Sequence, residues 1–163
     1  MRVVLDTVIY NRAVEYPKFG NVLRRACEQG HIQLVSTHVQ RDQLKATPDE
    51  GKRRELLMLF DAVSATIMPT AAAVWDVSKW DEAEWLDDER VKFFEQTLLG
   101  TAPAHAGHAN DALLAVTAFA MADMFLTADA GLLRRTRKAV LECGAKLAVL
   151  DYKDFVVELE THE

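Results

Sequence analysis

Four acidic side chains stand at the ends of predicted strands or in the helices beside them, and together they could bind a cation: Asp6, Asp42, Asp111 and Asp129. Asp6 directly follows the apolar run at residues 3–5, which predicts a buried strand. Asp129 comes just after the strand that we expect to end at Thr127. Because open parallel sheets bind ligands at the carboxyl ends of their strands, these two carboxylates are expected in one crevice.

The other two acids are expected to reach the same crevice from helices. Asp111 opens the alanine-rich helix predicted over residues 110–122, which leads into the strand that precedes Asp129. Asp42 lies one to two turns into the helix that follows a strand predicted at residues 31–35. Four acids from four different elements can therefore converge.

Each acid also has an ordinary structural explanation. Asp111 and Asp129 could cap helices, and Asp42 could be a solvated helix residue. Asp6 is the hardest to explain in this way, because a lone carboxylate closes a buried apolar strand. The functional interpretation therefore depends on the four acids acting in combination.

A convergent set of carboxylates has a definite chemistry. Clustered carboxylates repel one another, and burial makes the repulsion worse. A divalent cation relieves it, and an all-oxygen set of ligands suits Mg²⁺ or Mn²⁺ rather than zinc. One or two such ions could activate a water and stabilise the charge that develops on a phosphodiester during in-line displacement.

The elements that must position these acids alternate along the chain. Short apolar runs predict strands at residues 3–5, 31–35, 63–68, 124–127 and 146–150, with helices between them. Alternating strands and helices over 163 residues predict one α/β domain with a parallel sheet and helices on both faces. A helical insertion rich in acids and tryptophan is expected around residues 70–107.

The net charge of −6 is unevenly distributed. Residues 76–90 carry seven acids and two bases, and without this segment and the four acids above the rest of the chain has a net charge of +3. An acidic protein of this kind is compatible with nucleic-acid chemistry. Cations that could contact phosphates lie near the proposed ligands: Arg12, Arg41, Arg134 and Arg135.

Two widely spaced cysteines, Cys27 and Cys143, predict free thiols in a reducing compartment. The longest apolar stretch is too short to span a bilayer, and the first residues do not resemble a signal peptide. We therefore expect a cytoplasmic protein that does not bind membranes.

In this order and spacing, the sequence resembles the PIN-domain ribonucleases, a family that includes VapC-type toxins. The resemblance covers nearly the whole chain and is carried by Val3-Val4-Leu5-Asp6-Thr7, Val35-Ser36 through Asp42-Gln43-Leu44, Asp111-Ala112-Leu113-Leu114-Ala115, and Ala122-Asp123-Met124-Phe125-Leu126-Thr127-Ala128-Asp129. The chain departs from the family in three places. Asp42 is shorter than the usual Glu, Val8 stands where many members carry Asn, and residues 70–107 form a longer segment than in compact members.

The resemblance implies a metal-dependent endoribonuclease with a parallel sheet of strand order 3-2-1-4-5. It implies that the four acids hold Mg²⁺ or Mn²⁺ and that the hydroxyls of Thr7 and Thr127 support them. It also implies a homodimer, an RNA substrate and, if the chain is the toxin of a toxin–antitoxin pair, an antitoxin partner.

A second hypothesis is a catalytically weak PIN-like module that binds protein partners. Its binding surface would be the segment that contains Trp75, Trp80 and Trp85 among many acids. The short side chain of Asp42 favours this alternative, because it puts one ligand of the metal in doubt.

Overall fold

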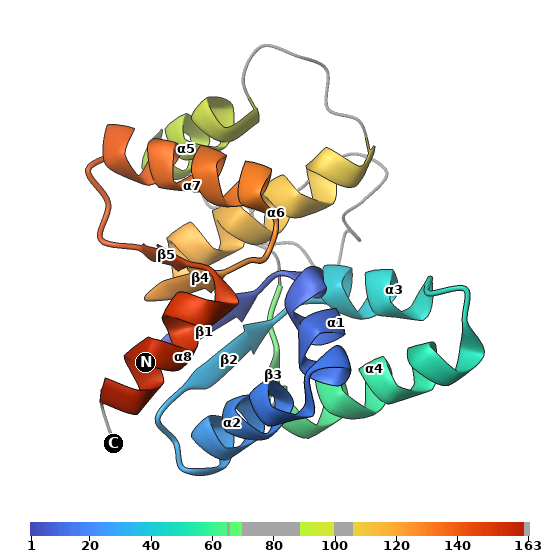
Figure 1. Cartoon of the computed structure of the whole chain (residues 1–163). Coiled ribbons are helices and arrows are strands. Elements are labelled where there is room, and N and C mark those ends of the chain that lie inside the picture. The colour runs from blue at the N-terminus through green and yellow to red at the C-terminus, as the bar shows by residue number, and fades with distance from the viewer. Residues whose placement is uncertain (65, 70–88, 100–105, 162–163) are drawn as a thin grey trace.

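The computed structural model describes residues 1–64, 66–69, 89–99 and 106–161. Its centre is a sheet whose paired strands are all parallel, in the order β3-β2-β1-β4-β5. Four strands have three or four residues: β1 (Arg2–Leu5), β2 (Gln33–Ser36), β4 (Met124–Leu126) and β5 (Ala148–Leu150). The predicted α/β class with a parallel sheet is therefore confirmed (Figure 1).

The prediction of five full strands needs a correction at the edge of the sheet. The strand predicted at residues 63–68 is reduced to a two-residue pairing, β3 (Thr66–Ile67), beside β2. Val63 is the last residue of the preceding helix, and Pro69 lacks the N–H that a longer strand would need. The sheet therefore consists of four strands with a short addition at one edge.

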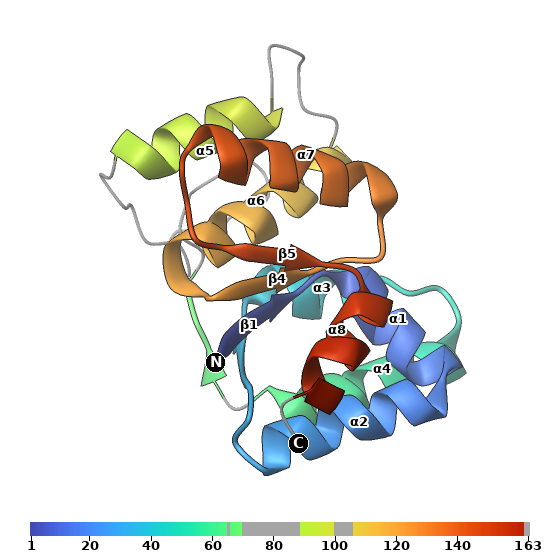
Figure 2. The same cartoon turned by 60° about the vertical axis from the view of Figure 1, so that its left-hand side comes forward.

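Helices cover both faces of the sheet, as Figure 2 shows. One face is covered by α1 (Thr7–Glu15), α2 (Pro17–Glu28), α4 (Glu50–Val63) and α8 (Tyr152–Thr161). The other is covered by α5 (Glu89–Leu99), α6 (Ala106–Met121) and α7 (Ala130–Glu142). Helix α3 (His38–Lys45) follows β2 directly. The insertion expected at residues 70–107 lies outside the described residues except for α5 and the start of α6.

Alternation along the strands divides the core into two clusters. In β1, Val3 and Leu5 belong to the cluster under α1, α2 and α4, whereas Val4 belongs to the cluster under α5, α6 and α7. In β4, Phe125 likewise points away from the side chains on either side of it. Successive side chains of a strand point to opposite faces, so a sheet that is covered on both faces has apolar residues at every position.

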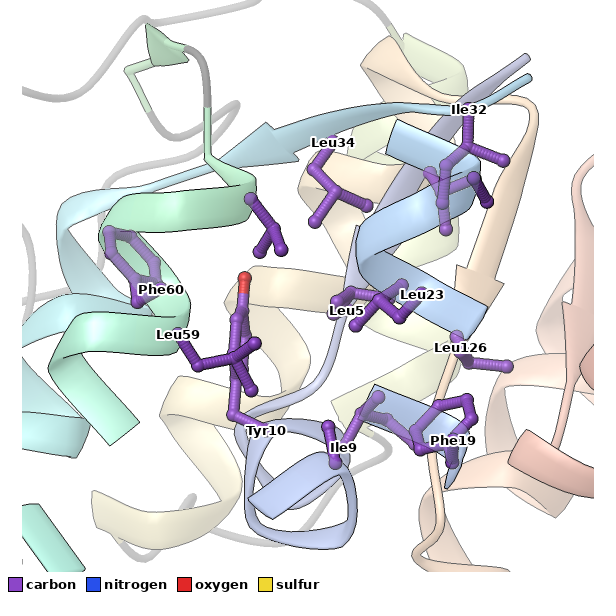
Figure 3. Close-up of a cluster of buried hydrophobic side chains, with 14 of the residues drawn as sticks. Leu5, Ile9, Tyr10, Phe19, Leu23, Ile32, Leu34, Leu59, Phe60 and Leu126 are labelled. Carbon is purple, nitrogen blue, oxygen red and sulfur yellow. The ribbon is translucent and has the colours of Figure 1, made fainter. Parts of the chain in front are cut away.

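The first cluster fixes the point at which β1 becomes α1. Leu5 and Ile9 are almost fully buried, and they pack together with Tyr10 and with side chains of α2 and α4 (Figure 3). The ring of Tyr10 lies 5.5 Å from that of Phe60 on α4. Asp6 lies between these anchored residues, so the core determines where its backbone is placed.

The ends of two helices test the sequence predictions. Helix α2 begins at Pro17 and is followed by Gly30 with a φ of +73°, as the sequence predicts. Helix α6 begins at Ala106, four residues before the predicted start. The prediction that Asp111 opens this helix, and could cap it, is therefore wrong.

Candidate metal site

Asp6 is a buried carboxylate at the carboxyl end of β1, with only 1% of its surface exposed. It occupies the cap position of α1, yet its side chain forms no cap hydrogen bond to the helix. Instead, Oδ2 accepts a hydrogen bond of 2.6 Å from the hydroxyl of Thr127, which is itself fully buried. The carboxylate is therefore directed across the sheet toward the end of β4.

Thr127 connects two of the predicted ligands. Its Oγ1 donates to Asp6 and also accepts a hydrogen bond of 3.1 Å from the backbone N–H of Asp129. The Oδ1 atom of Asp129 accepts from the N–H of Leu132 at 2.6 Å, so this residue caps α7. The Thr127 hydroxyl thus contacts the carboxylate of Asp6 and the backbone N–H of Asp129, and the carboxylate of Asp129 caps α7, which confirms its capping interpretation.

The hydroxyl of Thr7 lies on the other side of Asp6. Its Oγ1 is 2.6 Å from Oε1 of Gln43 and 3.4 Å from Oδ1 of Asp6. A hydroxyl has one proton to donate, and the shorter contact takes it to Gln43. The contact from the Thr7 hydroxyl to Oδ1 of Asp6 is therefore long and weak, whereas the contact from Thr127 to Oδ2 is short.

Asp42 does not face Thr7 in the way that its neighbour does. Its carboxylate lies 3.8 Å from the ammonium of Lys45 one turn further along α3, and its side chain is 44% exposed. Gln43, one position beyond the predicted acid, is the residue of α3 whose side chain contacts Thr7, and it is linked to Asp6 through that hydroxyl.

Asp111 lies half-buried in the second turn of α6, which packs against β1 and β4. Within the described part of the chain, no three His, Cys, Asp or Glu side chains gather closely enough to form a metal-binding group. Thr127 links the carboxylate of Asp6 to the backbone of Asp129, but the described residues do not form a compact set of the four predicted acids.

Burial raises the pKa of Asp6 above its usual value, because desolvation disfavours the charged carboxylate. The hydrogen bond from Thr127 is the largest opposing effect. An ionised Asp6 is therefore costly in this environment, and any positive charge that reaches Oδ1 would reduce that cost.

The donor set around Asp6 fits a hard cation. The polar groups that approach its carboxylate are the hydroxyls of Thr7 and Thr127 and the backbone N–H groups of Thr7 and Val8, and the amide oxygen of Gln43 contacts the Thr7 hydroxyl. Mg²⁺ prefers oxygen ligands and is commonly held by only one or two carboxylates, with waters and substrate phosphates as its other ligands. Oδ1 of Asp6, whose contact with Thr7 is the longer of the two hydroxyl contacts, is the atom at which such an ion would meet the protein.

A buried amide that the sequence analysis missed fixes the backbone beside Asp6. Gln40 is fully buried, and its Nε2 donates to the carbonyl of Leu5 at 2.6 Å. Its Oε1 accepts from the backbone N–H of Thr37, which completes a capping box at the start of α3. The Thr37–Gln40 spacing that is typical of a capping box is visible in the sequence. A prediction based on acidic residues includes neither Gln40 nor Gln43, because both are amides.

The predicted phosphate-binding arginines fall into two groups. The guanidinium of Arg12 lies 3.4 Å from the carboxylate of Glu15, and that of Arg41 lies 3.4 Å from the carboxylate of Asp61. Each of these arginines therefore already has an acidic partner. Arg134 and Arg135 are exposed in the second turn of α7, and within the described residues neither forms an ion pair. Because α7 begins directly after Asp129, this second pair lies one turn along the helix from one of the predicted ligands.

The chain matches no known protein family, no curated protein and no solved structure in the comparisons made. None of the described helices is both long and apolar enough to cross a membrane.

Proposed function

We propose that this protein is a metal-dependent endoribonuclease whose reaction takes place at Asp6. The observation that carries the proposal is the buried carboxylate at the carboxyl end of the central strand, whose Oδ2 is held by Thr127 and whose Oδ1 has a longer contact with Thr7. A fold needs no such group for stability, since burial of an ionised carboxylate is costly. The position is also the one at which open parallel sheets bind their ligands.

In this proposal Asp6 and Asp129 hold Mg²⁺ or Mn²⁺, and Asp111 approaches from α6. The cation supplies Lewis acidity and an activated water for hydrolysis of the phosphodiester. Thr127 orients the Asp6 carboxylate through its hydrogen bond, and Gln40 fixes the preceding backbone.

Two arginines would bind the RNA beside these acids. Arg134 and Arg135 project from α7 one turn beyond Asp129 and would contact its phosphates. The toxin role, the antitoxin, the homodimer and the cytoplasmic location stay predictions that rest on the sequence.

One observation favours the second candidate, a catalytically weak module that binds protein partners. The face of α3 that approaches Asp6 carries the neutral Gln43, while Asp42 lies near Lys45. Fewer charges near Asp6 would weaken metal binding and catalysis. The tryptophan-rich segment on which this candidate depends lies outside the described residues.

The test is cleavage of a mixed RNA pool by the purified protein with Mg²⁺ or Mn²⁺, beside Asp6→Asn and Asp129→Asn variants. We expect chelator-sensitive cleavage by the wild type and a loss of at least about a hundredfold in each variant, since each removes a charge that holds the metal. Equal background cleavage in all three proteins would refute the enzyme and leave the binding module.

Asp49→Asn is the matched control for Asp129→Asn. Asp49 caps α4 through a hydrogen bond of 2.6 Å from the N–H of Lys52, just as Asp129 caps α7. Asn is as good a cap as Asp, so both substitutions should leave the helices intact. If both variants keep full activity, Asp129 serves only as a cap.

A further inference from the structure

Strand β5 forms one open edge of the sheet. Among the described residues, β4 is the only strand that pairs with it. On the β4 side, the N–H of Ala148 donates to the carbonyl of Asp123 at 3.0 Å, and the carbonyl of Leu150 accepts from the N–H of Thr127 at 3.1 Å. The backbone groups of successive residues in a strand alternate between its two sides. The N–H and the carbonyl of Val149 therefore face the open edge.

Arg137 of α7 covers this edge. Its Nε donates a hydrogen bond of 2.9 Å to the carbonyl of Val149, and its Nη2 lies 3.6 Å from the carboxylate of Asp154 on α8. Helices α7 and α8 lie on opposite faces of the sheet (Figure 2). The side chain of Arg137 therefore extends around the edge from one face toward the other. The side chains of Arg137 and Asp154 are 48% and 59% exposed, so this edge lies at the molecular surface.

The opposite edge of the sheet is limited in a different way. There, β3 has only two residues, and Pro69 follows it closely in the sequence. Short edge strands, prolines and charged side chains are all means by which proteins keep a sheet edge from pairing with another chain. Strand β5 contains no proline, and its outward backbone groups belong to its central residue. At this edge the covering group is therefore a charged side chain.

A second copy of the chain is the partner that the β5 edge fits. A two-fold axis at Val149 would place this residue antiparallel to its counterpart, and the two residues could exchange a pair of N–H···O bonds. A two-fold interface uses the same patch on both subunits, so the edge is complementary to itself. The carbonyl that such a pair requires is the one that Arg137 occupies.

We propose that Arg137 guards the β5 edge by occupying the carbonyl of Val149, so that the edge does not pair with β5 of a second copy. Asp154 supports the guard by holding the guanidinium on the α8 side. Loss of the guard would convert the edge into a surface for self-association. The proposal goes beyond the proposed function and depends on neither a metal nor RNA.

The experiment measures self-association of the full chain by analytical ultracentrifugation over a series of protein concentrations. Arg137→Met cannot donate to Val149, and the concentration at which half of this variant is associated should be at least about tenfold lower than for the wild type, because a pair of backbone hydrogen bonds between copies becomes available. Arg137→Lys keeps a cation at the edge and should behave as the wild type. Circular dichroism would verify folding, and Arg137→Ala repeats the test with the best helix former.

Lys138→Met is the matched control. Lys138 is the next residue on α7, its side chain is 72% exposed, and its ammonium lies 3.7 Å from the carboxylate of Glu142. The substitution removes the same charge from the same helix without removing the bond to β5, so it should leave self-association unchanged. Equal association in Arg137→Met and Lys138→Met would overturn the inference, because loss of charge alone would then be sufficient. Wild-type behaviour of both Arg137→Met and Arg137→Ala would overturn it as well.

Amide hydrogen exchange, followed by NMR, locates the contact between copies. The N–H of Val149 would become a donor to the second copy, so its exchange in Arg137→Met should slow as the protein concentration rises. The N–H of Ala148 already bonds to the β4 side and should change little. Association without added protection at Val149 would overturn the inference, because the copies would then meet at another surface.

Discussion

Removal of the Thr127 hydroxyl should destabilise the protein, because it deletes the short hydrogen bond to the buried carboxylate of Asp6. Thr127→Val keeps the size and branching of the side chain but deletes the donor to Asp6 Oδ2 and the acceptor for the N–H of Asp129. Both Asp6 and Thr127 are almost wholly shielded from solvent, so water cannot replace the lost partner. The Asp6 carboxylate would remain buried, and of its two hydroxyl contacts only the long one with Thr7 would be left.

The magnitude follows from the kind of bond that is lost. A hydrogen bond to a charged group contributes about 1.5–3 kcal/mol, and an unsatisfied buried partner adds to the cost of its removal. We therefore expect a loss of about 3 kcal/mol in the free energy of unfolding at pH 7. For a chain of this length, that corresponds to a fall in Tm of about 6–12 °C.

The assay is urea denaturation followed by far-UV circular dichroism at pH 7 and at acid pH. The Thr127 hydrogen bond lowers the pKa of Asp6, and its removal should raise that pKa further. The deficit of Thr127→Val should therefore shrink at acid pH, where Asp6 is protonated in both proteins. Thr127→Ser keeps the hydroxyl and should recover most of the stability at pH 7.

Thr136→Val is the matched control for this prediction. Thr136 is fully buried on α7, and its hydroxyl has no hydrogen-bond partner within the described part of the chain. Its replacement by Val should change the free energy of unfolding by less than about 1 kcal/mol, since no bond is lost. Equal losses in Thr127→Val and Thr136→Val would refute the assignment of Asp6 as a charged group held by Thr127.

Two further predictions concern Asp6 and the packing beside it. Burial raises the pKa of Asp6 in the folded protein above its ordinary value of 3.8, so the folded protein holds the Asp6 proton to higher pH than the unfolded chain does. The free energy of unfolding should therefore fall as the pH rises from 3.8 through the raised pKa. Asp6→Asn should gain stability relative to the wild type across that window in urea titrations, and a pH-independent difference would contradict this. Gly20→Ala should cost about 1–3 kcal/mol, because a Cβ at position 20 would lie 2.5 Å from the carbonyl oxygen of Ala13. Gly51→Ala, where the nearest atom is 3.4 Å away, should instead be neutral or stabilising in the same measurement.

The fold class could be predicted because local patterns determine it. The apolar runs of β1 and β4, closed by Asp6 and by Thr127, are legible from residue types alone, since a strand buried on both faces must be apolar at every position. Pro17 and Gly30 likewise mark the ends of α2 through their own backbone preferences. These features need no knowledge of what lies across the sheet.

The identity of the side chains around Asp6 could not be read in the same way. Asp42 and Gln43 are neighbours on one helix, and a rotation of about 100° decides which of them meets Thr7. That rotation is set by how Val39 and Leu44 pack into the two cores, which no local pattern states. An expectation based on acidity selects Asp42, and the contact of the neighbouring Gln43 with Thr7 becomes visible only in the folded structure.

The sequence by itself thus determined that a carboxylate would close the central strand, because a strand end is a local property of the chain. Only the tertiary structure decided that Thr127 donates to one oxygen of Asp6 and that the Thr7 hydroxyl lies between the other oxygen and Gln43. The residues in this network are up to 121 positions apart. Their contacts depend on the register of β1 against β4 and on the rotation of α3, and both follow from burial of the core as a whole.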